Sequence, residues 1–326
     1  MNSAFLTRFK AAWPRLKQFL RLVILACVLW GIYKTIVDAQ AKFAAHEFSL
    51  GELHWRWIVA SGALYILAAL PAAWFWREAM LAMGQRPRFW EALRAYYVGN
   101  LGKYVPGKAL VVVLRAGLVS SSRVATGVAA LAVFVETLTL MAVGSVVAAL
   151  ILLILHRDQL FLTLIAVGLG LCAGIPTAPP LFRKIVRVLR VAKASPQVTE
   201  AVHGLKLGLM ARGWVAMTIS WICMGLSLWA TLKAMPETQA DLNDLGTILP
   251  LLIASIALAT VAGFMSLIPG GFLVRELVVT MLLKPVVGEV AAIVSAVVLR
   301  LVSLLSELVV LSILYVVVRP PTDEQP

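Results

Sequence analysis

Apolar runs about as long as a bilayer is thick recur along this chain. The main ones cover residues 22–37, 57–76, 128–155, 159–178, 213–234, 248–268 and 288–318. A helix needs about 20 mainly apolar residues to cross the roughly 30 Å of hydrocarbon in a membrane. Hydrophobic residues make up 61% of the 326 and charged residues only 14%, a composition typical of polytopic membrane proteins. We therefore expect an all-α integral membrane bundle of about seven or eight transmembrane helices.

The distribution of positive charge predicts how these helices are oriented. Of the 29 Lys and Arg residues, twenty fall in the N-terminal segment 1–21 and in the connections 77–123 and 183–212. The opposite connections carry mainly Asp and Glu. Because cytoplasmic loops are enriched in Lys and Arg, we expect a cytoplasmic N-terminus. The chain then divides into a basic cytoplasmic segment (1–21), a transmembrane domain (22–318) and a short polar tail (319–326).

The net charge of +13 bears on partners as well. The basic residues lie beside apolar spans and lack the basic-aromatic pattern of nucleic-acid-binding modules, so no nucleic acid is expected. They are better suited to anionic lipid headgroups. The segment RKIVRVLRVAKASPQ at 183–197 is predicted to be an amphipathic helix along the membrane surface.

Two Pro-Gly motifs interrupt the apolar pattern. They read GNLGKYVPGKALVVVLR at 99–115 and SLIPGGFLVRE at 266–276. Pro and Gly next to charge in a membrane protein predict broken or re-entrant helices, which are tolerated only where protein or a wet cavity satisfies the backbone. Function is expected at these two motifs.

Each motif is followed by an unusually long apolar run, at 124–155 and 286–318. A continuous helix of over thirty residues would reach about 50 Å, which exceeds the bilayer. Each run is therefore expected either to tilt strongly or to include a surface or re-entrant piece. The repeated order of motif and long helix suggests a duplicated architecture, as in transporters built from repeats.

Charged residues near the motifs are the main candidates for a binding site, because a charge at the bilayer centre costs at least about 2.5 kcal/mol. One interpretation is structural: Lys103 and Lys108 lie at the interface, and Arg275 and Glu276 form ion pairs with Arg300, Glu307 or Glu136. The other is a pocket for an anionic headgroup. The candidate headgroup-binding residues are Asn100, Lys103, Pro106, Gly107, Lys108, Arg115, Glu136, Pro269, Gly270, Gly271, Arg275, Glu276 and Arg300.

In the second interpretation, each Pro-Gly starts a half-helix whose free N–H groups face a phosphate, and the cationic side chains add charge. Glu136 and Glu276 would orient the arginines, with Tyr104, Ser266 and Ser303 completing the shell. The motifs should then converge around one polar cavity that Arg115, Glu136, Arg275 and Arg300 face.

Signals for catalysis are few. The four histidines are isolated in predicted connections, and the chain shows no nucleophile and base pair, no Walker loop and no Asp-rich metal site. Cys27, Cys172 and Cys223 lie far apart in apolar segments and are expected to be plain thiols. We therefore expect no enzyme activity, no cofactor and no metal.

At the motifs the chain resembles the lysylphosphatidylglycerol synthase transmembrane-region family, related to the flippase domain of bacterial multiple-peptide-resistance proteins. The resemblance is strongest in SLIPGGFLVRE and the following VVLRLVSLLSELVV, and weaker in GNLGKYVPGK and VFVETLTL. The first motif lacks the Gly-Glu pair often found after Pro-Gly in the family. The second has Leu273 where a glycine is common.

The resemblance implies a multi-pass protein of the bacterial cytoplasmic (inner) membrane that handles lipid and, in characterised relatives, moves an aminoacylated phospholipid between leaflets. The chain ends at Pro326, shortly after the last span, so we expect no aminoacyl-transferase domain. The first hypothesis is a translocator of an anionic or isoprenoid-type lipid. The alternatives are a membrane-embedded transferase or accessory subunit for lipid-linked sugar or hopanoid synthesis, and a structural partner. A homo-oligomer or a lipid-biosynthesis enzyme as partner remains open.

Overall fold

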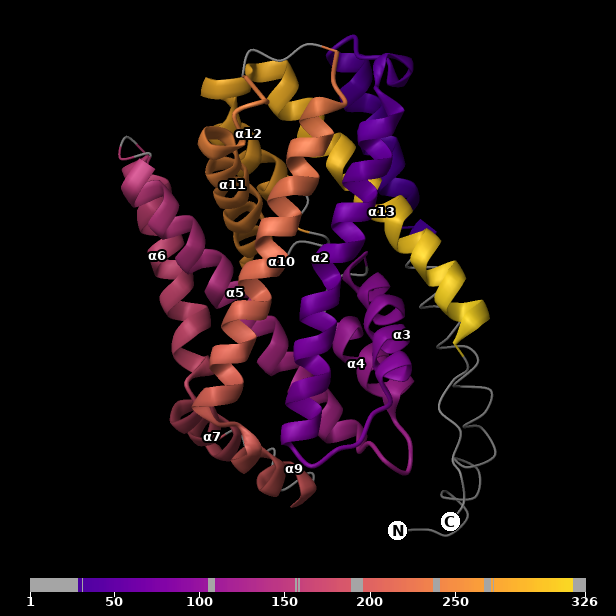
Figure 1. The fold of residues 1–326 in the computed structure, drawn as a ribbon, viewed down its shortest axis with the longest axis vertical. Helices are drawn as coiled ribbons and strands as arrows, with labels where there is room; N and C mark the ends of the chain where they lie inside the picture. Colours follow the sequence, from indigo (N-terminus) through magenta and orange to yellow (C-terminus); the bar gives the residue numbers. More distant parts are fainter. Residues whose placement is uncertain are drawn as a thin grey trace, which may run out of the picture.

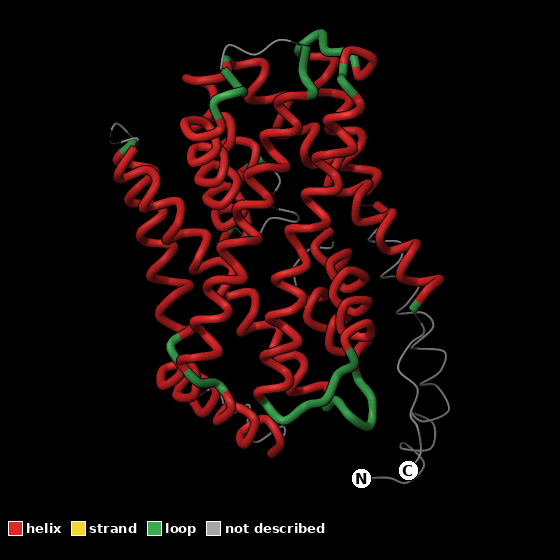
Figure 2. Tube along the Cα trace, viewed as in Figure 1, coloured by secondary structure: helices red, strands yellow, loops and turns green. Residues whose placement is uncertain are grey.

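The computed structural model describes residues 29–30, 32–104, 109–155, 157, 159–188, 196–236, 241–266, 271 and 273–318. In this part of the chain every regular element is a helix, and the connecting loops gather mainly at the two ends of the bundle (Figure 2). The predicted all-α fold is therefore confirmed. Some segments and residues for which we made predictions lie outside the described residues. They are segment 1–21, the tail 319–326, Cys27, Pro106, Gly107, Lys108, Pro269 and Gly270.

Six helices in the described part are long and apolar enough to cross a membrane. They are α2 (Trp55–Ala82), α5 (Thr126–Leu155), α6 (Leu160–Gly174, prolonged to Thr177 by a 3-10 turn), α10 (Leu207–Lys233), α11 (Leu245–Met265) and α13 (Glu289–Val317). Each overlaps one of the apolar runs seen in the sequence. A further helix covers residues 32–45, at the end of the first apolar run. The chain is thus a polytopic helical membrane protein.

Three other helices are too short to cross a bilayer. α3 (Phe89–Asn100), α4 (Ala109–Val119) and α12 (Val274–Val287) have 12, 11 and 14 residues, against about 20 for a span. α3 and α4 are antiparallel, because Gly99 lies against Arg115 and Gly102 lies against Val111. α12 packs in turn against α11. The interruptions at the two motifs are therefore helical hairpins, α3–α4 and α11–α12.

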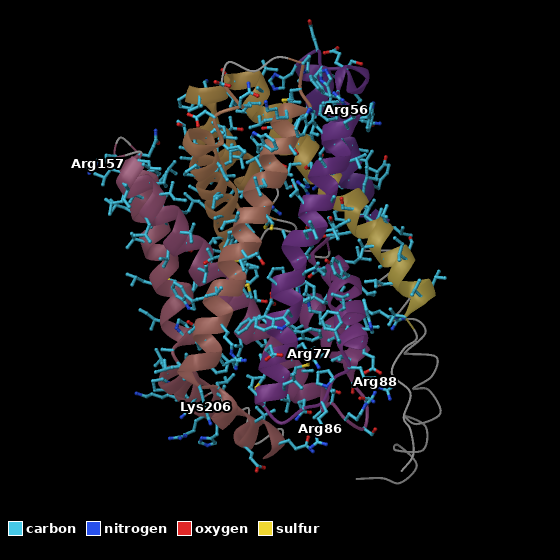
Figure 3. All side chains as sticks on the ribbon, viewed as in Figure 1. Arg56, Arg77, Arg86, Arg88, Arg157 and Lys206 are labelled. Atoms are coloured by element: carbon cyan, nitrogen blue, oxygen red, sulfur yellow. The ribbon has the colours of Figure 1, made fainter. Side chains whose placement is uncertain are left out.

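The two hairpins lie in opposite halves of the bundle, α3–α4 in the lower half and α11–α12 in the upper half (Figure 1). Side chains labelled in Figure 3 define the two ends, with Arg77, Arg86, Arg88 and Lys206 near the lower end and Arg56 and Arg157 near the upper end. α2 runs down and is followed by the lower hairpin and by α5, which runs up. α10 runs up and is followed by the upper hairpin and by α13, which runs down. The same unit thus occurs twice with opposite direction, the arrangement of inverted repeats in transporters.

α5 and α13 are each one continuous helix, of 30 and 29 residues, or about 45 Å at 1.5 Å per residue. Figure 1 shows α13 crossing the bundle obliquely. Of the two expectations for these long runs, a re-entrant piece within the run is wrong for both helices. The short helices that interrupt the apolar pattern lie instead in the hairpins that precede them.

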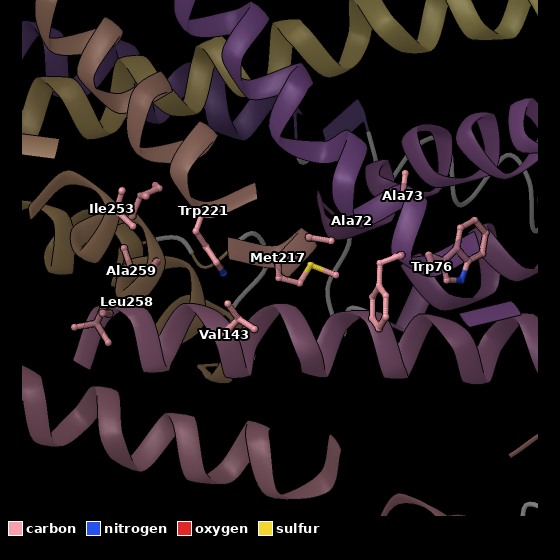
Figure 4. Close-up of a cluster of buried hydrophobic side chains, with 14 of the residues drawn as sticks. Ala72, Ala73, Trp76, Val143, Met217, Trp221, Ile253, Leu258 and Ala259 are labelled. Carbon is pink, nitrogen blue, oxygen red and sulfur yellow. The ribbon is translucent and has the colours of Figure 1, made fainter. Parts of the chain in front are cut away.

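The core forms where long helices approach closely. α2 packs along α10, and the Ser61 hydroxyl lies 2.8 Å from both the Ser227 carbonyl oxygen and the Thr231 hydroxyl. Small residues let membrane helices approach and form such hydrogen bonds. Buried side chains from α2, α5, α10 and α11 fill the adjacent space, among them Trp76 and Trp221 (Figure 4).

Two helices lie across the lower end, α7 (Pro179–Val188) and α9 (Pro196–Ala201). α7 is amphipathic as predicted for this segment: Phe182 and Val186 are buried, whereas Lys184 and Arg187 are exposed. Residues 189–195 lie outside the described residues.

One use of the charge pattern needs correction. We counted eight basic residues of 77–123 as a surface connection, yet Arg94 and Arg115 are buried, with 7% and 4% of their surface exposed. The reason is that this segment folds into the α3–α4 hairpin, which carries both arginines into the bundle. Arg77, Arg86 and Arg88 remain at its lower end (Figure 3).

Candidate functional site

The tip of the first hairpin binds a carboxylate of α13. Lys103, in the 3-10 turn that follows α3 (Leu101–Tyr104), forms an ion pair with Glu307. The hydroxyl of Tyr65 on α2 donates to Glu307 Oε1 at 2.6 Å, and that of Tyr104 donates to Oε2 at 3.1 Å. Glu307 is only 3% exposed, so a cation and two hydroxyls satisfy a buried charge. These contacts connect the first hairpin to the last helix of the second unit.

Glu276, in the first turn of α12, holds a second set of polar contacts. Its carboxylate accepts hydrogen bonds from Arg300 Nη1 at 2.9 Å and from Lys42 Nζ at 3.0 Å. It also accepts the backbone N–H of Leu273 at 3.0 Å, so it caps its own helix. One N–H at the start of this half-helix, where we expected free N–H groups to face a phosphate, is therefore bonded to a carboxylate. The expected contact between Glu276 and Arg300 is confirmed. The described hydrogen bonds and ion pairs do not join Glu276 to its sequence neighbour Arg275.

Arg275 differs from these cations because it forms no ion pair with a carboxylate in the part of the chain that the structure describes. Its Nη2 donates to the Thr260 hydroxyl of α11 at 3.3 Å. Arg275 lines a cavity of about 40 Å³, which has room for about three or four waters at roughly 10–15 Å³ each. The polar side chains around this cavity are those of Tyr65, Ser227, Arg275, Glu276, Arg300 and Ser303.

Tyr65 joins the two motifs in space. It lines the cavity beside Arg275, and its hydroxyl accepts a hydrogen bond from Lys103 Nζ at 3.1 Å. Described residues that flank the two motifs, more than 160 positions apart in sequence, therefore lie around one tyrosine. We call Tyr65, Arg275, Glu276, Arg300 and Ser303, with the cavity between them, the central polar site.

Arg115 and Glu136 form a separate buried pair. Arg115 Nη1 donates to Glu136 Oε2 at 2.7 Å, and Nη2 donates to the Asn100 amide oxygen. The Arg115 guanidinium also lies 3.8 Å from the Tyr96 ring centroid, and the Tyr96 hydroxyl donates to Glu136. We expected this pair to face the same cavity as Arg275, but neither residue is among the described residues that line it. The Arg115 guanidinium is already in contact with Glu136, Asn100 and the Tyr96 ring.

Several residues of the site escaped the sequence reasoning. Lys42 and Thr35 come from the first helix, where Thr35 accepts a hydrogen bond from Arg300 Nη2 at 3.4 Å. Tyr65 and Thr260 lie inside apolar spans. A single polar side chain in such a span is the available signal, since it must find a partner, but nothing in the sequence identifies the partner.

Gly271 is buried and has φ +67, as a residue in a tight turn. It is the one glycine of the second Pro-Gly motif that the structure describes. Residues with a Cβ rarely adopt this positive φ, so the turn itself favours glycine at this position.

Six long apolar helices with two oppositely directed hairpins define the class of the protein, a polytopic helical membrane protein. The sequence matches the family described as lysylphosphatidylglycerol synthase TM region over residues 18–310. The chain therefore belongs to this family, as its motifs suggested. No curated protein matches the chain.

Proposed function

We propose that this protein moves a lipid with an anionic headgroup between the two leaflets of the bacterial cytoplasmic membrane. The headgroup would bind in the central polar site while the acyl chains remain in the hydrocarbon. Membership of a lipid-associated membrane family supports this proposal. The arrangement of the described residues supports the binding of an anion in particular.

The observation that carries the proposal is the state of Arg275. Two other cations of the site region, the half-buried Lys103 and the buried Arg115, each face a carboxylate, whereas Arg275 is itself half-buried. Arg275 lines a cavity instead, with a threonine hydroxyl as its described hydrogen-bond partner. A charge at such depth costs at least about 2.5 kcal/mol without compensation. An anionic ligand would supply the compensation.

The hairpins suggest how access alternates. One hairpin enters from each end of the bundle (Figure 1), and both reach Tyr65 through Lys103 and Arg275. Movement of either hairpin would open the central polar site toward its own end. Such alternation around a fixed central site is how inverted repeats work in transporters.

The proposal includes an orientation and assigns no chemical step. The lower end, with Arg86, Arg88 and Lys206 (Figure 3), would be cytoplasmic by the positive-inside rule. The N-terminus would then be cytoplasmic too. Because the residues of the site bind and orient rather than react, we propose a transporter and not an enzyme.

The test removes the charge of Arg275 and measures lipid movement. Purified Arg275→Gln protein is reconstituted in liposomes that contain fluorescent phosphatidylglycerol, and a membrane-impermeant reductant reports lipid that reaches the outer leaflet. We expect the rate to fall at least about tenfold, since a charged hydrogen-bonding group contributes roughly 1.5–3 kcal/mol. Arg275→Lys should retain part of the rate, because it keeps the charge but loses the planar fork.

Arg212→Gln provides the matched control. Arg212 is mainly exposed and lies in a surface ion pair with Glu78, so its loss should leave lipid movement unchanged. The melting temperature of each variant is recorded in the same detergent. An unchanged rate in Arg275→Gln contradicts the proposal. A loss of rate that parallels a loss of folded protein favours a purely structural role for Arg275 instead.

A further inference from the structure

The side chain of Arg275 is held between two glycines of its own hairpin. A Cβ on Gly263 of α11 would lie 2.5 Å from Arg275 Cγ, and a Cβ on Gly271 would lie 2.9 Å from Arg275 Cγ and Cδ. The same Cβ on Gly271 would also lie 2.9 Å from Gly263 Cα. The aliphatic stem of Arg275 therefore fits only because both positions lack a side chain. We call Gly263 and Gly271 the glycine clamp.

Thr260 orients the other end of the side chain. It precedes Gly263 by three residues on α11, so both lie on the same face of the helix. Its hydroxyl accepts from Arg275 Nη2, which fixes the plane of the guanidinium. The remaining N–H groups of this fork match two oxygens of one phosphate.

The first hairpin contains a second arginine, Arg115, whose side chain packs on a glycine and whose guanidinium has known partners. A Cβ on Gly99 would lie 2.4 Å from Arg115 Cγ, so Arg115 also packs on a glycine of the preceding helix. Its guanidinium contacts the Glu136 carboxylate and the Asn100 amide oxygen. Within this chain, the same construction thus presents an arginine to oxygen acceptors, of which one is an anion. At Arg275 the described residues supply a hydroxyl but no carboxylate.

We propose that Thr260, Gly263 and Gly271 are positioning residues that fix the Arg275 guanidinium for two-point contact with a single phosphate group. The inference rests on the proposed function and specifies its ligand chemistry. A phosphate carried by a lipid and free inorganic phosphate share this chemistry. Because both glycines and Thr260 belong to the α11–α12 hairpin, the arginine moves with the hairpin as one unit.

The experiment measures binding separately from lipid movement. Variants Gly263→Ala, Thr260→Val and Thr260→Ser are compared with the native protein for thermal stabilisation by short-chain phosphatidylglycerol and by inorganic phosphate. The concentration of labelled phosphatidylglycerol that gives half-maximal movement is measured in liposomes. Gly168→Ala is the matched control, because Gly168 lies in a helix and a Cβ there meets nothing within 4 Å.

We expect Gly263→Ala to raise the half-saturating lipid concentration about tenfold or more, as for a lost charge-assisted hydrogen bond. Thr260→Val should have the same direction of effect, and Thr260→Ser should restore native binding because it retains the hydroxyl. Gly168→Ala should behave as the native protein. If inorganic phosphate and lipid both stabilise the native protein, and Gly263→Ala loses both effects, a phosphate group alone is sufficient for binding. If only lipid stabilises the native protein, and Gly263→Ala loses that effect, the bound phosphate is the one carried by a lipid headgroup.

Native-like half-saturation in both Gly263→Ala and Thr260→Val overturns the inference while leaving the translocator intact. A Thr260→Ser variant as impaired as Thr260→Val also overturns it, because only the hydroxyl distinguishes them in this role. If the native protein binds neither ligand and moves no lipid, the proposed function itself fails.

Discussion

Leu273 holds the backbone in a conformation that residues with side chains rarely adopt. Its φ is 65 and its ψ is −47, immediately before α12, and 57% of its side chain is exposed. Such a positive φ costs roughly 1–2 kcal/mol in a residue with a Cβ.

Leu273→Gly is therefore expected to stabilise the folded protein by about 1 kcal/mol, because glycine adopts this conformation without steric strain. The measurement is the free energy of unfolding in mixed micelles of increasing denaturing detergent. Leu277→Gly serves as the comparison: Leu277 is 60% exposed in the helical part of α12, where glycine should cost about 1 kcal/mol. Destabilisation by both substitutions would contradict the account of strain at Leu273.

The sequence predicted which residues belong to the central polar site better than it predicted which residues they contact. Charge in an apolar chain identified Arg275, Glu276 and Arg300 as candidates, because such residues must be compensated. Their actual partners include Lys42, which lies 234 positions from Glu276. A contact across that distance depends on how whole helices pack, which no local pattern encodes. Whether these residues bind a headgroup stays a prediction.

Among the elements, the first hairpin packs against α5 and is joined to it by one buried ion pair. Arg115 and Glu136 have side chains only 5% and 2% exposed, and removing one partner of a buried pair typically costs about 3–5 kcal/mol. Glu136→Gln should thus lower the free energy of unfolding by about 3 kcal/mol, because Arg115 is left uncompensated. Unfolding in mixed micelles again provides the measurement.

Two further variants complete this test. Glu289→Gln removes an exposed pair with Lys284, in which both side chains are more than half exposed, and should cost less than about 1 kcal/mol. The double variant Arg115→Met with Glu136→Gln should recover part of the loss, since no buried charge remains unpaired. A loss in Glu136→Gln no larger than that in Glu289→Gln would show that the pair does not hold the hairpin.

The sequence predicted the long helices well and the short ones poorly. Apolar runs placed α2, α5, α6, α10, α11 and α13, because lipid requires long uninterrupted hydrophobic segments. α3 escaped because FWEALRAYYVGN mixes charged and apolar residues, as a surface connection does. The polar face of such a helix is covered by neighbouring helices, and its sequence alone does not show this.

At the scale of the whole molecule, the two ends of the bundle should be distinguishable in intact cells. Cysteines replacing Arg86, Lys206 or Arg157, each in a background without Cys27, Cys172 and Cys223, are treated with an impermeant maleimide. All three native side chains are exposed, and Figure 3 places the first two at the lower end and Arg157 at the upper end. We expect labelling at position 157 only, because the positive-inside rule predicts that the basic end is cytoplasmic.

Permeabilised cells should label at all three positions, which controls for reactivity. Labelling of positions 86 and 206 but not 157 would reverse the orientation and leave the fold intact. A difference between positions 86 and 206 would contradict the fold itself, because both belong to one end. The sequence predicted this common end through its basic residues, although it did not show that some of them enter the bundle.

The short return helix α12 also has an electrical consequence. Arg275 is its second residue, so about 18 Å of helix separates this guanidinium from the upper end, more than half of the roughly 30 Å hydrocarbon thickness. One charge that crosses a membrane potential of 100 mV changes in energy by about 2.3 kcal/mol. In the proposed translocator, a phosphate bound at Arg275 would have crossed about half of that voltage drop. The hairpin would thus divide the passage of an anion through the field into two steps of about 1 kcal/mol each, and a potential negative inside would favour the outward direction in both.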